Sequence, residues 1–124
     1  MAASMRRYYA RFALLHVRRG TLSGKRIVPE AWLAETRRGN HETFRGDYRE
    51  ALPRGAYHNQ FWIEDPDRRA YMARGICGQY IYIDPEFDFA AVKLSTWPDF
   101  VNSERSAETI ADVKAIRTHV GPAA

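Results

Sequence analysis

The residues of this 124-residue chain that could do chemistry gather in one short run, Gly75-Ile76-Cys77-Gly78-Gln79. Cys77 is the single cysteine, and a thiolate beside backbone N–H donors would be an activated nucleophile. Such a nucleophile needs a base, and the sequence offers no recognisable histidine partner for it. The pattern therefore favours a small, half-buried pocket residue at Cys77 over a catalytic thiol.

Other reactive constellations are missing from the sequence. The histidines and carboxylates show none of the spacings that are typical of metal ligands, and no glycine-rich phosphate loop occurs. A single cysteine also excludes an internal disulfide. We therefore expect no metal and no cofactor. The histidines are His16, His41, His58 and His119.

Length and composition predict one compact domain over residues 1–124, because the chain is too short for two cores. Apolar residues make up 45% and aromatic residues 13% of the chain, which is typical of a globular protein. No apolar run approaches the roughly 18–20 residues that a membrane span needs. The residues after Met1 contain no unbroken apolar run typical of a secretory signal. As given, the chain is expected in the cytoplasm and away from membranes.

The net charge of +4 is unevenly spread. Residues 1–54 carry twelve Lys and Arg against five Asp and Glu, whereas residues 55–124 carry seven against ten. The arginines are scattered among apolar and acidic residues, which is typical of a solvated surface. Aromatic and arginine side chains in the strand region could stack on single-stranded nucleic acid, but that region is net acidic. We expect no nucleic-acid partner.

Three segments show helical patterns. Apolar residues recur every three or four positions from Ser4 to Arg19, with Ser4 as the expected N-cap and Gly20 as the stop. Pro29 opens a short second helix through Trp32 and Leu33. The last helix should begin with Ser103 or Ser106 as its cap and run to about Val120.

Between these helices the apolar period changes to two, which predicts strands. Residues 38–55 lack periodicity and should form a long irregular loop of the functional or mobile kind. Short turns separate the extended runs, so antiparallel pairing is the simplest topology. The expected fold class is α+β: an antiparallel β meander of three to four strands, with an N-terminal amphipathic helix and a C-terminal helix packed on it. The expected strands are Tyr57 to Ile63, Ala70 to Arg74, Gln79 to Asp84 and Phe89 to Ser95.

Three stretches, taken in order, resemble the serine β-lactamase and penicillin-binding-protein superfamily, in its esterase and 6-aminohexanoate-dimer (nylon-oligomer) hydrolase branch. The first is Tyr9-Ala-Arg-Phe-Ala-Leu-Leu-His-Val-Arg-Arg-Gly20, similar to a helix of that family. The second is Gly24-Lys-Arg-Ile-Val-Pro-Glu-Ala-Trp32, similar to the start of its next helix. The third and most specific runs from Met72-Ala-Arg-Gly-Ile-Cys-Gly-Gln-Tyr-Ile-Tyr-Ile-Asp-Pro85 to Val92-Lys-Leu-Ser-Thr-Trp-Pro98. The resemblance covers nearly the whole chain except the 38–55 loop.

The resemblance implies three sequence boxes: Ser-x-x-Lys, a Tyr or Ser box, and a Lys-Thr-Gly-like strand box. In the amide-hydrolase branch the third box reads Gly-Ile-x-Gly-Gln, which matches Gly75 to Gln79. It implies that the Ile76 N–H is one oxyanion donor and that Gly75 and Gly78 let a substrate carbonyl approach the backbone. Cys77 and Gln79 would also line the substrate site. Asp99 follows the last strand, near where relatives contact substrate.

The first box has no match. No serine in the chain has lysine at the third position after it. Tyr57-His-Asn59 fits the string of a Tyr box, but it lies in a strand pattern and too late in the chain, so a strand edge is favoured.

The sequence thus indicates the C-terminal part of a β-lactamase-like serine hydrolase that acts on a small amide or ester, inactive alone because it lacks the nucleophile. Its partner would be the missing N-terminal half or a second copy. The alternative is a non-catalytic binding or assembly module that pairs with another chain.

Overall fold

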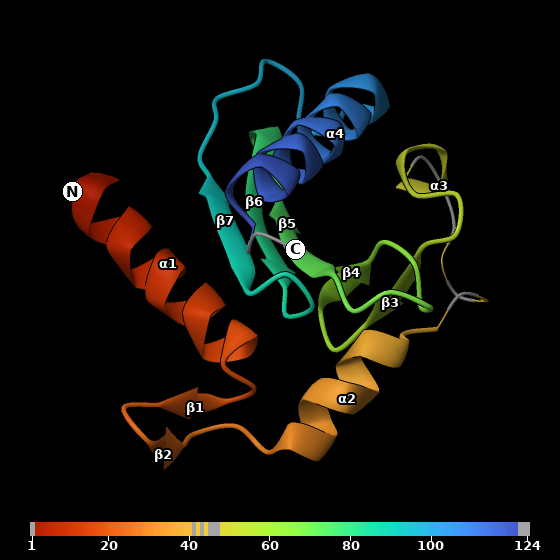
Figure 1. Cartoon of the computed structure of the whole chain (residues 1–124). Helices are drawn as coiled ribbons and strands as arrows, with labels where there is room; N and C mark the ends of the chain where they lie inside the picture. The colour runs from red at the N-terminus through yellow and green to blue at the C-terminus, as the bar shows by residue number, and fades with distance from the viewer. Residues whose placement is uncertain (1, 41, 43, 45–47, 122–124) are drawn as a thin grey trace.

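The computed structural model describes residues 2–40, 42, 44 and 48–121. It has an α+β fold in which a five-stranded antiparallel sheet carries helices on both faces (Figure 1). The strand order is β3-β4-β5-β6-β7, so every strand lies beside its neighbour in sequence. The predicted fold class is confirmed.

The first helix, α1 (Ala2–Val17), begins before the predicted cap: Ser4 lies inside the helix, so the N-cap prediction is wrong. The helix ends at Val17, and the left-handed residue that closes it is Arg19, with a φ of +56°. Gly20 follows with a φ of +83°, and its N–H donates to the Leu15 carbonyl, so the predicted stop is wrong by one position. A Cβ at Gly20 would lie 2.2 Å from the Val28 carbonyl oxygen, so only glycine fits.

A small hairpin follows α1. It consists of β1 (Thr21–Leu22) and β2 (Lys25–Arg26) and leads through Pro29 into α2 (Glu30–Arg38). α2 is longer than the predicted short helix. Within the predicted irregular loop lies one short helix, α3 (Tyr48–Ala51), and residues 41, 43 and 45–47 of that loop are outside the described part.

The strands of the main sheet match the predicted runs except at the first. The run from Tyr57 to Ile63 is two strands, because Asn59 and Gln60 adopt φ values of +49° and +66° and turn the chain back on itself. Asparagine tolerates this left-handed conformation better than most residues, so Asn59 suits the first position of the turn. The five strands are β3 (Ala56–His58), β4 (Phe61–Ile63), β5 (Tyr71–Gly75), β6 (Gln79–Asp84) and β7 (Phe89–Lys93).

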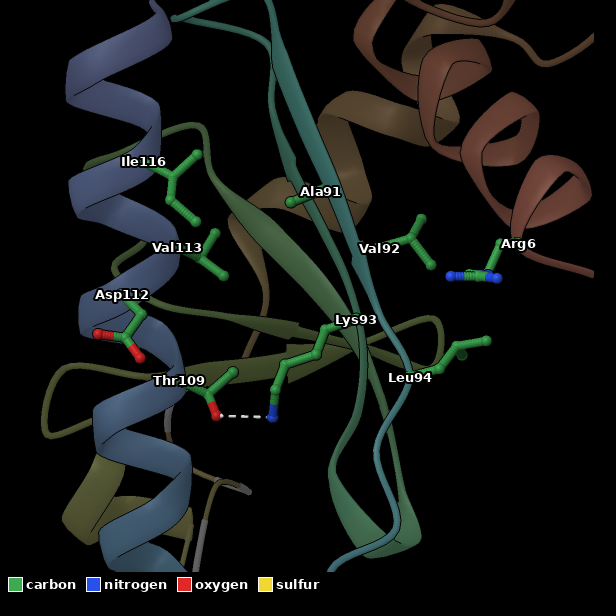
Figure 2. Close-up of a pocket in the computed structure, with 9 residues that line it drawn as sticks. All are labelled: Arg6, Ala91, Val92, Lys93, Leu94, Thr109, Asp112, Val113 and Ile116. Atoms are coloured by element: carbon green, nitrogen blue, oxygen red, sulfur yellow. Dashed lines mark hydrogen bonds between the residues drawn. The ribbon is translucent and has the colours of Figure 1, made fainter. Parts of the chain in front are cut away.

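The two faces of the sheet pack against different helices, and Figure 2 shows β7 running between them. On one face, Met72 and Tyr82 pair across β5 and β6 and belong to a core that includes Ile110 and Val113 of α4 (Ser103–Val120). On the other face, Tyr71 pairs with Ile83 in a core that includes Ala13 and Val17 of α1. Successive residues of a strand point to opposite faces of the sheet. Each strand therefore contributes side chains to both cores in alternation.

Neither predicted serine caps α4. Asn102 is the N-cap, and its side-chain Oδ1 accepts a hydrogen bond of 2.9 Å from the Arg105 N–H. Ser103 is the first helical residue and Ser106 is buried in the first turn, so the cap prediction is wrong by one position.

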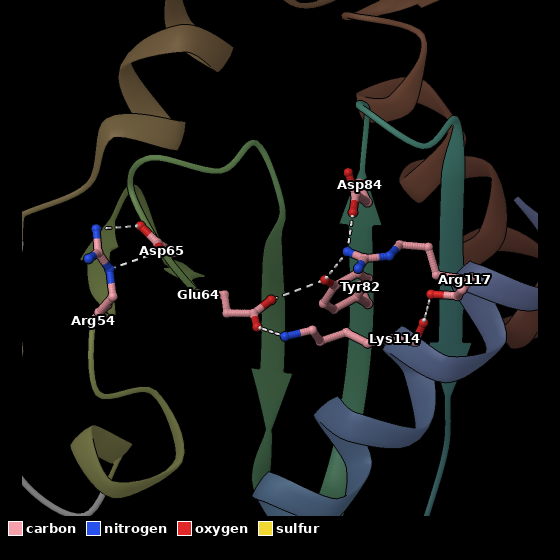
Figure 3. A network of polar contacts seen from close by, with 8 residues as sticks. Arg54, Glu64, Asp65, Tyr82, Asp84, Lys114 and Arg117 are labelled. Carbon is pink, nitrogen blue, oxygen red and sulfur yellow. Dashed lines mark hydrogen bonds and ion pairs between the residues drawn. The ribbon is translucent and has the colours of Figure 1, made fainter. Parts of the chain in front are cut away.

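A polar network fastens α4 to the sheet near its C-terminal end (Figure 3). Lys114 Nζ lies 2.5 Å from Glu64 Oε1, and Arg117 Nη1 lies 2.6 Å from Asp84 Oδ2. The Tyr82 hydroxyl donates to Glu64 Oε2 at 3.2 Å. Burial, then the neighbouring Glu64 carboxylate, raise the pKa of Tyr82. Because all these groups have partners across elements, we assign the network to the packing of α4.

Candidate functional site

The residues that the sequence singled out come together in the connection from β5 to β6. Gly75 and Gln79 face each other as the last cross-strand pair, and Ile76–Gly78 form a 3₁₀ turn between them. Cys77 and Gly78 both adopt left-handed backbone, with φ values of +57° and +83°. The turn stands at one end of the sheet, with the loop of residues 94–102 beside it.

The turn and loop hydrogen bonds around this turn involve Cys77 and not the N–H of Ile76. The Cys77 N–H donates to the Phe100 carbonyl at 3.0 Å, and the Cys77 carbonyl accepts from the Trp97 N–H at 3.1 Å. No turn or loop hydrogen bond of the described backbone uses the Ile76 N–H. The Ile76 side chain is 63% exposed. An N–H in this position can donate to an incoming oxygen atom.

Gly78 is held against the ring of Trp97. A Cβ at Gly78 would lie 2.4 Å from Trp97 Cε2, well inside any permitted contact. Gly75 is different: its φ of −114° suits any residue, and a Cβ there would lie 3.1 Å from Gln79 Cβ. Gly78 is therefore required by packing and backbone conformation, whereas Gly75 keeps the surface beside Ile76 open.

Gln79 uses its side chain to extend the sheet. Its Oε1 accepts from the Ser95 N–H at 3.1 Å, and its Nε2 donates to the Ser95 carbonyl. The Ser95 hydroxyl in turn donates to the Gly78 carbonyl at 2.9 Å. The Gln79 carboxamide thus takes the place of a neighbouring strand residue and bonds to the backbone of Ser95, just beyond β7. This contact holds the loop against the turn. Gln79 positions the site through this contact.

The other two expected site residues lie near the turn in different settings. Cys77 is half-buried, and within the described residues no hydrogen bond or ion pair engages its thiol. Asp99 lies in the same loop as Trp97, but its exposed carboxylate accepts a 3.2 Å hydrogen bond from Asn102 Nδ2 at the start of α4. Asp99 therefore supports the helix cap.

Two hollows flank the turn, one on each face of the sheet. The hollow on the α1 face has a volume of about 460 Å³ and is mainly apolar. The hollow on the α4 face has a volume of about 280 Å³ and includes Gly75 and Ile76 themselves. The remaining residues of the α4-face hollow are Trp62, Arg74, Tyr80, Trp97, Phe100, Val101 and Ser106.

The sequence reading missed two cations on this side of the turn. Arg74 Nη2 donates to the Ser106 hydroxyl at 2.8 Å, and its guanidinium carbon lies 5.3 Å from the centre of the Tyr80 ring. Lys93 Nζ lies 4.7 Å from the centre of the Trp97 ring and 3.2 Å from Thr109 Oγ1. Burial lowers the pKa of Lys93. The signal available beforehand was the alternation of β5 and β6, which places Arg74 and Tyr80 on one face.

The Tyr57-His-Asn59 string lies where a strand edge was expected. Tyr57 exchanges two backbone hydrogen bonds of 3.3 Å with Asn40, and its ring packs edge-on against Trp62. Asn59 Nδ2 donates to Thr36 Oγ1 at 2.9 Å. These contacts are those of a fastened hairpin.

No group of three or more His, Cys, Asp or Glu side chains in the described part of the chain could hold a metal ion. Each described helix is also too short or too polar to cross a membrane.

Comparison with known proteins finds two named hydrolases that are similar to this chain. The chain is 34% identical over 82 residues to the 6-aminohexanoate-dimer hydrolase of Paenarthrobacter ureafaciens, a match that covers 64% of this chain and 21% of the relative. This chain resembles part of a 6-aminohexanoate-dimer hydrolase. A solved structure from Bacillus anthracis, provisionally named as such a hydrolase, superposes with a TM-score of 0.71 at 27% identity. That match covers 93% of this chain and 29% of the other. No family model matches the chain.

These two matches support the hydrolase resemblance and the β-lactamase-like fold. The chain spans roughly a fifth to a third of the length of the proteins it matches, as the shares of 21% and 29% give.

Proposed function

We propose that this chain supplies the oxyanion side of an amide or ester hydrolase that works through an acyl-serine intermediate. The observation that carries the proposal concerns Ile76, the residue just after β5: no turn or loop hydrogen bond of the described backbone uses its N–H. The match to a 6-aminohexanoate-dimer hydrolase supports amide chemistry.

In the proposed reaction, a serine from outside this chain attacks the carbonyl carbon of the substrate, and its proton passes to a basic partner. The carbonyl oxygen becomes negatively charged, and the Ile76 N–H donates one of the hydrogen bonds that stabilise it. The bond to the amine or alcohol then breaks, and that leaving group takes up the proton. Water attacks the acyl-serine in the same way and releases the acid.

Rigidity of the turn supports this role. Trp97 against Gly78, and Gln79 on Ser95, hold in place the backbone that follows Ile76. An oxyanion donor is effective when its direction is fixed before the charge develops. The exposed Gly75 leaves the approach to that N–H open.

We also propose that the nucleophile lies on a further segment, which adds a strand to β7. β7 is an edge of the sheet, and its residues Ala91 to Lys93, together with Leu94 just after it, line a groove of about 710 Å³ between α1 and α4 (Figure 2). The other edge, β3, is partly covered by the bridge from Asn40 to Tyr57. An extended segment could pair with the backbone of β7 while its side chains fill the groove. The alternative of a non-catalytic assembly module draws on this same groove.

One observation and one assay test the hydrolase proposal. An in-frame Ser-x-x-Lys upstream of Met1 in the coding sequence supports it, and its absence from a complete reading frame contradicts it. In the enzyme reconstituted with its nucleophile segment, Gly75→Val should lower kcat by roughly tenfold or more, since a side chain beside Ile76 hinders the approach to its N–H. Gly75→Ala should have a smaller effect, and thermal unfolding should show that both variants fold.

A further inference from the structure

The chain has three lysines, Lys25, Lys93 and Lys114, and their amino groups lie in different settings. Lys25 is exposed in the small hairpin, and the Lys114 amino group is occupied by its ion pair with Glu64. Lys93 is partly buried on β7, and among the described residues no carboxylate forms an ion pair with it. Burial without an ion pair is the setting in which a lysine gives up its proton most readily.

Two contacts fix the position of the Lys93 amino group. Its Nζ lies 3.2 Å from Thr109 Oγ1 and 4.7 Å from the centre of the Trp97 ring. Figure 2 shows the side chain reaching from β7 toward Thr109 of α4. Thr109 is buried and α4 packs on the sheet, so the amine is placed before any reagent arrives.

Two hollows reach Lys93 from outside. One is the groove between α1 and α4, and the other is a hollow of about 440 Å³ beside α4 and Trp97. The lining of this second hollow includes no other residue of β7, so a further strand on that edge need not cover it. Its charged residues other than Lys93 are three carboxylates and one guanidinium, which repel an anionic reagent on balance: Glu104, Glu108, Asp112 and Arg105.

Two side chains of α4 act on the charge of Lys93 in opposite directions. Burial lowers the pKa of Lys93, the Asp112 carboxylate opposes this change, and the Arg105 guanidinium adds to it. The aromatic rings beside Lys93 favour its ammonium form, but the guanidinium of Arg74 lies over one of the same rings and competes for that attraction. On balance the pKa of Lys93 is lowered, which leaves more of the amine unprotonated near neutral pH.

We propose that Lys93 is a nucleophilic amine that is acylated by uncharged acyl donors such as small thioesters. In this step the Nζ lone pair attacks the thioester carbonyl carbon, a C–N bond forms and the C–S bond breaks. The sulfur leaves as a thiol and takes up the proton that Nζ loses, so Lys93 becomes an uncharged amide. The step needs no second segment, and it does not depend on the proposed hydrolase.

The thioester S-acetyl-N-acetylcysteamine is the probe, and peptide mass spectrometry compares its initial rates at the three lysines. In the folded chain at pH 7, Lys93 should react at least about threefold faster than Lys25, because a lowered pKa leaves more free amine. Lys114 should react more slowly than Lys25, since Glu64 occupies its amino group. In the urea-unfolded chain these differences should disappear, because they come from the fold.

Asp112→Asn and Arg105→Met form a matched pair of variants in the same hollow. Asp112→Asn removes a charge that favours the ammonium form and should speed acylation of Lys93 about twofold or more. Arg105→Met removes a repelling cation and should slow it by a similar factor. Both side chains are exposed, so both variants should fold, which thermal unfolding checks. A change in the exposure of Lys93 alone would not move the two rates in opposite directions.

Equal rates at Lys25 and Lys93 in the folded chain would overturn the proposal, and so would two variants that change the rate in the same direction. Acetyl phosphate is the second probe, because it delivers the same acyl group with a negative charge. It should show no preference for Lys93 over Lys25, since the carboxylates of the hollow repel it. A preference for Lys93 with acetyl phosphate as strong as with the thioester would contradict the choice of an uncharged donor.

Discussion

His16 Nδ1 and the Tyr71 hydroxyl lie 2.7 Å apart in the core and join α1 to β5. The two residues are 3% and 0% exposed, so each is the other's polar partner inside an apolar cluster. Burial lowers the pKa of His16 from 6.5 to about 4 and raises the pKa of Tyr71. The imidazole of His16 is therefore uncharged at neutral pH, and one hydrogen bond joins its Nδ1 to the Tyr71 hydroxyl.

This pair predicts a loss of stability in mild acid. Between pH 6.5 and about pH 4, the unfolded state binds a proton at His16 that the folded state does not. The free energy of unfolding is unaffected by His16 above pH 6.5. It falls as the pH drops to about 4, by up to about 3 kcal/mol. Urea unfolding at several pH values measures it.

The double variant His16→Leu with Tyr71→Phe is the control, because it removes both polar groups together. Its free energy of unfolding should depend less on pH over the same range. Parallel curves for the variant and the wild type would show that His16 is not the responsible group.

The spacing of apolar residues was enough to predict most strands of the main sheet and the helices α1 and α4. Gln79 to Asp84 was predicted with the bounds that β6 has, since it is framed by a glycine turn and a proline. The split at Asn59 was missed because two residues in left-handed backbone leave the alternation on either side intact. Periodicity records which face a side chain takes and not the direction of the chain.

The site was predictable in part, for a related reason. The Gly75-to-Gln79 run is local, so its residues had to meet in one turn. Arg74, Trp97 and Ser106 come from three elements and converge only because β5 pairs with β6 and α4 packs over them. No spacing along the chain records such an approach.

Gly78 and Gly24 provide a matched pair for testing the turn. Their φ values are +83° and +75°, but a Cβ at Gly78 would meet Trp97 at 2.4 Å, whereas nothing lies within 4 Å of Gly24. Gly24→Ala should cost only the backbone strain of about 1–2 kcal/mol. Gly78→Ala should cost at least about 1 kcal/mol more, since overpacking is added to that strain. Equal losses in chemical denaturation would mean that Trp97 moves aside freely.

Gln79→Glu should make the stability of the loop depend on pH. Nε2 donates to the Ser95 carbonyl, and a carboxylate in that place would repel it. Burial and this repulsion raise the pKa of the new acid in the folded state above about 4.3, its unfolded value. The penalty is therefore absent below about pH 4.3 and grows as the pH rises to 7, to about 1–3 kcal/mol.

Gln79→Met separates charge from the loss of hydrogen bonds. It removes both contacts with Ser95 and should destabilise the chain by an amount that does not change with pH. The test compares each variant with the wild type by urea unfolding at pH 4.5 and pH 7. A Gln79→Glu deficit that stays constant between the two would contradict the placement of the carboxamide.

The open edge of β7 predicts that the isolated chain associates with itself. Without the proposed extra strand, this edge and the groove beside it are the available pairing surface, and exposed apolar residues such as Tyr9, Leu94 and Ile116 lie near it. Val92→Lys places a charge in the groove beside Arg6 and should shift the chain toward the 14.3 kDa monomer in sedimentation equilibrium. Tyr57→Lys, on the opposite edge strand, should leave association unchanged. A wild-type chain that stays monomeric at all concentrations and unfolds cooperatively would show that β7 needs no partner and that the domain is self-sufficient.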